Sequence, residues 1–158
     1  MSDARFEDGA DQPMLLTAQD GESLTVLSAL LQDAVFPITQ MAYAKSRRRF
    51  AVLLNRFRWE DRDHAQTADR RYERVQSLLV FHDVLSVQTM GIDRADKDTV
   101  LSLLQIGFEA GSDGTGRVTL ILSGDGSVGL QIETLDAQLR DVTRPYLAPS
   151  GKQPGHSL

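Results

Sequence analysis

The sequence contains no cysteine, so disulfide bonds, thiolate nucleophiles and cysteine-ligated metal centres are all excluded. It also lacks any apolar stretch approaching the ~20 residues that a membrane-spanning helix needs. The first thirteen residues are acidic and polar, unlike the basic start and apolar core of a signal peptide. We therefore expect a cytoplasmic protein with no membrane partner.

Positive charge is scarce except in one region of the chain. Ten of the seventeen Lys and Arg residues lie between Lys45 and Arg74, where the net charge is +5. The segments before and after this region carry −6 and −4, and the whole chain carries −5. A basic region on an acidic protein either pairs with acidic groups of the same chain or binds a partner. The sequence leaves both interpretations open.

The chain has the size and composition of one globular domain. Its 158 residues are 41% hydrophobic, and a domain of this length buries roughly 70% of its unfolded surface. Residues 1–13 are charged and aperiodic, and residues 147–158 are rich in Pro, Gly and Ser. We predict a disordered N-terminus, a single globular domain over residues 14–146 and a flexible tail.

One segment, from about Glu22 to Val35, has the periodicity of an amphipathic helix. The apolar residues that share one face are Leu24, Leu27, Leu30, Leu31, Ala34 and Val35. Asp20 is placed as the N-cap, and Pro37 is expected to stop the helix. We predict that this helix packs against the rest of the domain and has no catalytic role.

The remainder of the chain is typical of short strands separated by turn residues. The seven predicted strands are Ile38–Ala44, Arg49–Trp59, Val75–Phe81, Leu85–Met90, Val100–Phe108, Val118–Ser123 and Val128–Thr134. Tight connections, such as the one at His82-Asp83, indicate antiparallel pairing. The sequence of Met14–Thr17 is compatible with a further strand, and that of Leu135–Val142 with a short helix.

These elements predict an α+β fold, with one helix packed on about seven antiparallel strands in two curved sheets or a partly open barrel. The order is similar to that of a pleckstrin-homology-like barrel, although here the longer helix precedes the strands, and this analogy implies no function. A shift of 43 residues superposes Val75 on Val118 and Leu79 on Leu122. This match fits either a duplicated three-strand unit or two ordinary hairpins of similar length, and we prefer the second.

The strand Arg49–Trp59 determines how the basic region is displayed. Alternation along a strand places Phe57 and Trp59 on one face and Arg56 and Arg58 on the other. The aromatic rings are therefore not interleaved with the arginines, as a base-stacking platform requires. We expect Phe57 and Trp59 to face the core, and Arg56 and Arg58 to face solvent or acidic groups.

The candidate binding residues are five arginines of this strand and the preceding turn: Arg47, Arg48, Arg49, Arg56 and Arg58. They form either a site for an anion or acidic partner, or a solvated turn and a salt-bridged sheet face. In the second interpretation the nearby acids are Glu60, Asp61 and Asp63. We prefer the second interpretation.

Other familiar chemical motifs are missing. The glycine-rich segment Gly111–Arg117 precedes no predicted helix and lacks the Lys-Ser/Thr ending of a P-loop. The DRADKD segment, residues 93–98, lacks the Gly and Glu that an EF-hand needs at its sixth and twelfth positions. The three histidines have no metal-ligand spacing, and there is no GxSxG nucleophile motif. We predict no catalytic residue, no metal and no cofactor.

Five long motifs follow one another along the chain: LSALLQDAV, RRFAVLLNRFRWE, RYERVQSLLVF, GIDRADKDTVLSLL and LQIETLDAQLRDVTRPY. In this order they resemble an uncharacterised bacterial family, domain-of-unknown-function family 2948, over roughly Met14 to Tyr146. The family has no assigned activity, cofactor or functional residue. The resemblance therefore implies a single domain and leaves the function open.

Three functions are compatible with the sequence. We favour a non-catalytic cytoplasmic binding or protein-interaction domain that uses the basic strand and turn to bind an unknown protein partner or an anionic ligand. The charge distribution also permits a homo-oligomer. The alternatives are RNA binding through Lys45–Arg74, which we rank lower, and an enzyme with a site assembled from scattered polar residues. Those scattered residues are Asn55, Arg56, Arg58, Tyr72, Glu73 and His82.

Overall fold

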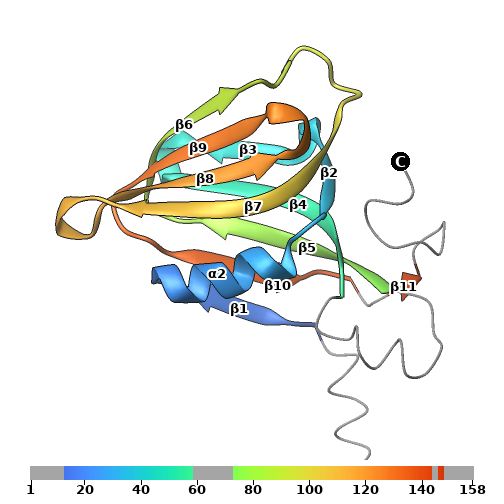
Figure 1. Ribbon diagram of the computed structural model, residues 1–158, viewed down its shortest axis with the longest axis horizontal. Helices are drawn as coiled ribbons and strands as arrows, with labels where there is room; N and C mark the ends of the chain where they lie inside the picture. The colour runs from blue at the N-terminus through green and yellow to red at the C-terminus, as the bar shows by residue number, and fades with distance from the viewer. Residues whose placement is uncertain (1–12, 59–72, 144–145, 148–158) are drawn as a thin grey trace, which may run out of the picture.

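The computed structural model describes residues 13–58, 73–143 and 146–147. These residues form one α-helix and an antiparallel sheet, so the α+β class is confirmed (Figure 1). The predicted disordered ends lie almost entirely outside the described residues, as do Trp59, Glu60, Asp61, Asp63 and Tyr72. Among the described residues, no helix is long and apolar enough to cross a membrane.

More strands are present than the seven predicted. They are β1 (Leu15–Ala18), β2 (Val35–Pro37), β3 (Met41–Ala44), β4 (Arg49–Phe57), β5 (Glu73–Phe81), β6 (Val84–Met90), β7 (Val100–Ala110), β8 (Gly116–Leu122), β9 (Ser127–Ile132), β10 (Ala137–Asp141) and β11 (Tyr146–Leu147). The additional strands are β1, which was an open alternative, and β2, β10 and β11. They are short, so their sequence patterns are weaker than those of β4 or β7.

The strands form one sheet in the order β1-β10-β5-β4-β2-β7-β8-β9-β6, with β3 also paired to β4 and β11 to β5. Every pairing is antiparallel, as predicted. The β7–β8–β9–β6 part lies over the β3–β4–β5 part in Figure 1. The β2–β7 pairing joins these two parts, so they are not separate sheets, and the sheet is not closed into a barrel.

The helix α2 (Gly21–Leu30) begins as predicted but ends earlier. Asp20 is its N-cap, and its carboxylate accepts a hydrogen bond from the Ser23 backbone N–H at 2.7 Å. Asp33 then adopts a left-handed conformation (φ 64°), and its N–H donates to the Leu103 carbonyl at 2.7 Å. The chain thus enters β2 before Pro37, and the prediction that Pro37 ends the helix was wrong. The apolar periodicity continued to Val35 because the residues after the helix are also largely buried.

The core lies between the two parts of the sheet, with α2 covering its side. Leu24, Leu27 and Leu31 are buried there, and α2 contacts both β1 and β7. Ser28 is the polar member of this helix face, and its hydroxyl accepts a hydrogen bond from the Ile106 N–H at 2.9 Å. The prediction that this helix packs against the domain is confirmed.

Two connections differ from the predictions. Leu135–Val142 is not a short helix: it contains β10, in which Ala137, Leu139 and Asp141 are buried and alternate with exposed residues. The turn at His82-Asp83 does not close a hairpin, because β5 pairs with β4 and β10, whereas β6 pairs with β9. Since β8 and β9 do pair with each other, the two segments of the 43-residue match are not copies of one pairing unit.

Candidate functional site

The strands β3 and β6 are two free edges of the sheet that approach each other at one end. Within the described residues, β3 pairs only with β4, and β6 only with β9. At the near end the Val84 N–H donates to the Arg48 carbonyl at 2.8 Å, and the Tyr43 hydroxyl donates to the Val84 carbonyl at 2.8 Å. Further along, no ladder of backbone hydrogen bonds joins the two strands in the described chain. We call this region between β3 and β6 the seam.

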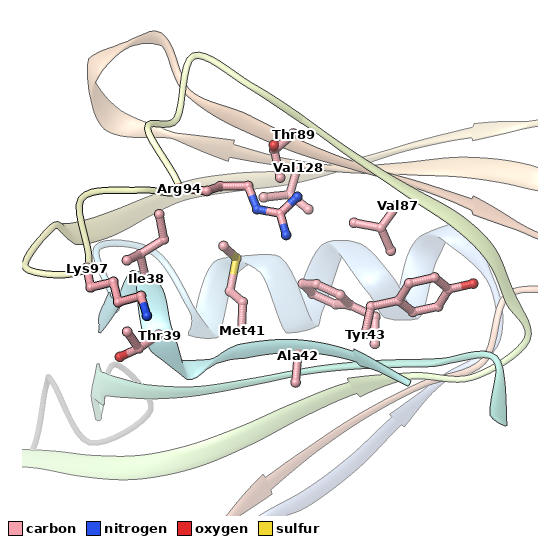
Figure 2. A pocket seen from close by; sticks show the side chains of 11 residues that line it. Ile38, Thr39, Met41, Ala42, Tyr43, Val87, Thr89, Arg94, Lys97 and Val128 are labelled. Carbon is pink, nitrogen blue, oxygen red and sulfur yellow. The ribbon is translucent and has the colours of Figure 1, made fainter. Parts of the chain in front are cut away.

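A cavity of about 300 Å³ lies in the seam (Figure 2). Its apolar lining residues are Ile38, Met41, Ala42, Tyr43, Phe50, Val87 and Val128. Its polar lining residues include Thr39, Thr89, Arg94 and Lys97. The seam cavity therefore combines an apolar floor with hydroxyl and cationic groups.

The local sequence of each strand explains this lining. In β3, Met41 and Tyr43 alternate with exposed alanines, so both larger side chains lie on the same side of the strand. In β6, a register shift between Val84 and Ser86 changes the alternation. Beyond that bulge, Val87 and Thr89 are half-buried and face the seam cavity.

The connection between β6 and β7 carries the two cations of the cavity. Figure 2 shows the Arg94 guanidinium directed over the cavity and the Lys97 side chain near Ile38 and Thr39. Both side chains belong to exposed residues, and neither forms an ion pair with any described residue. They are consequently available to an anion that enters the seam.

The acidic side chains of the same connection contribute to its own folding. The Asp93 carboxylate accepts a hydrogen bond from the Ala95 N–H at 3.0 Å, and the Asp96 carboxylate accepts one from the Asp98 N–H at 3.2 Å. Such bonds from an aspartate to the backbone two residues later stabilise tight turns. The motif that fails as a calcium loop thus forms a turned connection that presents Arg94.

The five predicted arginines do not converge on one site. Arg47 and Arg49 are exposed, at the end of the 3-10 helix η2 (Lys45–Arg47) and at the start of β4. Arg48 adopts a left-handed conformation (φ 51°), and its Nη1 atom lies 2.6 Å from Oε2 of Glu133. Both members of that ion pair are more than half exposed.

Arg56 and Arg58 pair with acidic groups of the same chain. Arg56 is fully buried, and its Nη2 atom lies 3.0 Å from each carboxylate oxygen of Asp141. The Ser77 hydroxyl donates to the same carboxylate at 2.6 Å. Arg58 Nη1 lies 2.6 Å from Glu73 Oε2. The interpretation of a salt-bridged sheet therefore describes these two arginines, with Asp141 and Glu73 as their acids among the described residues.

The alternation predicted for β4 is present, but its core face was assigned to the wrong side. Arg56 points inward with Val52 and Leu54, which are buried in the core. Phe57, on the opposite face, is buried as well, and the Arg74 guanidinium lies 3.9 Å from the centre of its ring. Asp141 was missed as the partner of Arg56 because 85 residues separate the two in the sequence.

The described residues among those suggested for a scattered enzyme site do not line the seam cavity. Asn55 lies on β4, and Glu73 begins β5. His82 follows the other end of β5, which is nine residues long. A strand of nine residues spans about 30 Å, so Glu73 and His82 do not meet. Arg94 and Lys97 were not among the predicted site residues, because DRADKD was judged by its carboxylates alone.

A family model described as "Protein of unknown function (DUF2948)" matches residues 14–156. The chain belongs to this family. The resemblance stated from the motifs between Met14 and Tyr146 is thereby confirmed. Comparisons with curated proteins and with solved structures gave no match. The assignment of a site in this DUF2948 member therefore depends on its own geometry.

Proposed function

We propose that this protein is a non-catalytic binding domain whose ligand is a small anion with an apolar body. The ligand occupies the seam cavity, with its anionic group at Arg94 and Lys97 and its apolar part on the floor between β3 and β6. The observation that carries the proposal is the position of two cations, unpaired among the described residues, over an apolar cavity. Apolar pockets with a few placed polar groups are the common form of small-molecule sites.

The cavity volume limits the size of the ligand. About 300 Å³ is at the lower end of the range of ligand pockets. At about 30 Å³ for each water-sized group, the volume holds about ten non-hydrogen atoms. Octanoate has that size and the required chemistry, so it is a suitable probe, and burial of each methylene contributes about 0.8 kcal/mol.

The charge of the ligand is tested by reversing the two cations of the cavity. Calorimetric titration with octanoate compares the wild type with Arg94→Glu/Lys97→Glu. Each exposed charge contact is worth about 0.5 kcal/mol. Changing two attractions into two repulsions therefore weakens binding by about 2 kcal/mol, or about thirtyfold in Kd.

A matched control makes the same change of net charge elsewhere. Arg47→Glu/Arg49→Glu reverses two exposed arginines that do not line the seam cavity. Because salt at 0.15 M screens exposed charges that do not contact the ligand, this variant should bind octanoate within about twofold of wild type. If both variants lose octanoate affinity equally, or if the wild type does not bind octanoate, the seam cavity is not an anion site.

The alternatives from the sequence have less support. RNA binding by base stacking needs exposed rings beside the arginines, but the two rings that the structure describes in β4, Phe50 and Phe57, are buried. The polar residues suggested for an enzyme, as far as the structure describes them, are absent from the cavity lining. An interaction with a protein partner retains support from the exposed Arg49, but it involves another face of the molecule.

A further inference from the structure

The outer face of the sheet at β1, β10, β5 and β4 has an unusual composition for this acidic protein. Its residues are the outward positions of the four strands, which alternate with the buried positions. None of these outward positions holds Asp or Glu, whereas three of them hold Arg49, Arg74 and Arg140. We call this surface the outer face. It gives a chain of net charge −5 one surface of positive sign.

A shallow depression of about 230 Å³ lies on the outer face. Arg49 and Arg140 line it from β4 and β10, on either side of β5. Between them lie Leu78 and Val80, which are half-buried. Neither Arg49 nor Arg140 forms an ion pair with another described residue. The depression therefore presents two available guanidinium groups beside partly exposed aliphatic side chains.

We infer that the outer face docks an extended acidic segment of a partner protein. Arginine and apolar side chains without acidic residues are complementary to a segment in which Glu or Asp alternates with apolar residues. An arginine binds a carboxylate through two parallel hydrogen bonds, so Arg49 and Arg140 can each hold one acidic side chain. The aliphatic residues between them would contact the apolar side chains of the segment.

The size of the outer face favours a segment over a folded domain. The four strands have four, five, nine and nine residues, and at 3.3 Å per residue and about 4.8 Å between strands they cover roughly 430 Å². That is about half of the ~800 Å² that each partner of a standard protein–protein interface buries. A nucleic acid is a poorer fit, because the one aromatic residue at an outward position, Phe57, is buried under Arg74.

The probe for this inference is an eight-residue peptide of alternating Glu and Val, labelled for fluorescence anisotropy. The matched peptide carries Gln in place of Glu. We expect the wild type to bind the Glu peptide at least tenfold more tightly than the Gln peptide, with affinity falling as salt increases. Equal binding of the two peptides, or no binding of either, would overturn the inference.

Paired variants separate the outer face from the seam cavity. Arg49→Glu/Arg140→Glu should weaken binding of the Glu peptide at least tenfold and leave octanoate binding unchanged. Arg94→Glu/Lys97→Glu should leave peptide binding within about twofold of wild type. If the first pair binds the peptide as the wild type does, the outer face is not the docking surface, whatever the outcome for octanoate.

Two further measurements test whether each variant is folded and whether a different polyanion binds the outer face. Circular dichroism of each variant establishes that it is folded, and Arg49→Gln/Arg140→Gln replaces the first pair if the reversal unfolds the protein. A decamer of uridylate and vesicles containing an anionic lipid are tested in the same assay. Tighter binding of either than of the Glu peptide, lost in the Arg49/Arg140 variant, would overturn the assignment to a protein segment.

Discussion

Replacing Asp141 with alanine is the most demanding test of how the core is organised. The Asp141 carboxylate accepts hydrogen bonds from Arg56 Nη2 at 3.0 Å, from the Ser77 hydroxyl at 2.6 Å and from the Met14 N–H at 3.0 Å. These contacts connect β10 to β4, to β5 and to the start of β1. Asp141→Ala would leave the Arg56 guanidinium buried without its carboxylate.

The expected magnitude follows from that burial. Removing one partner of a buried ion pair costs about 3–5 kcal/mol, because the remaining charge stays desolvated. A domain of this kind has a free energy of unfolding of about 5–15 kcal/mol, so Asp141→Ala should remain folded but be strongly destabilised. The double variant Arg56→Met/Asp141→Leu leaves no charge in the core. Its free energy of unfolding should fall by less, about 1–3 kcal/mol, mainly because the Ser77 hydroxyl and the Met14 N–H no longer have an acceptor.

Urea denaturation followed by circular dichroism measures these differences. Arg48→Ala serves as a control, because its ion pair with Glu133 is exposed and should contribute less than about 1 kcal/mol. If Asp141→Ala lowers the free energy of unfolding by less than about 1 kcal/mol, the ion pair with Arg56 does not stabilise the core as we infer. If the double variant is less stable than Asp141→Ala, the buried charge is not the cause of the loss.

The remaining predictions concern two glycines, Gly91 after β6 and Gly107 in β7, and the N-cap of α2. Gly91 has φ +68°, and an added Cβ would lie 2.8 Å from the Asp125 carbonyl oxygen, so Gly91→Ala should lower the free energy of unfolding by about 2 kcal/mol or more. At Gly107 an added Cβ would meet no heavy atom within 4 Å beyond its chain neighbours, so Gly107→Ala should be nearly neutral in the same denaturation assay. The backbone and side-chain hydrogen bonds of Ser23 lower the pKa of Asp20 below its ordinary value of 3.8. Its charge therefore stabilises the helix above that pH, and this stabilisation is lost as the pH falls through the lowered pKa. The stability difference between wild type and Asp20→Asn, measured at pH 7 and at pH 3, should accordingly shrink at pH 3, and a constant difference would contradict this.

The sequence predicts those parts of the fold that depend on local patterns. The Asp20 cap, the alternation along β4 and the strand β5 depend on local patterns, so they were predicted from the sequence. The end of α2 was not predicted, because it depends on a hydrogen bond from the Asp33 N–H to the carbonyl of Leu103, seventy residues away. The segment Leu135–Val142 was compatible with a short helix, but the pairing of β10 with β1 and β5 decides its conformation instead.

The candidate site was less predictable than the fold. A cluster of charge in the sequence directed attention to Arg56, yet its position is determined by a carboxylate that only the fold brings close. The importance of Arg94 depends on the edges of β3 and β6, which are remote in sequence and do not pair. Arg94 and Lys97 lie in an acidic segment, and nothing in the sequence indicates a binding site there until the cavity that they line is known.

The central claim is that an amphipathic anion binds between β3 and β6. Its most direct test is a titration of ¹⁵N-labelled protein with octanoate, followed through the backbone amide resonances. We predict saturable shifts in β3, at Val87 and Thr89, and in the connection that carries Arg94 and Lys97. Shifts confined to the strands of the outer face, or none up to the solubility limit of octanoate, would contradict the claim.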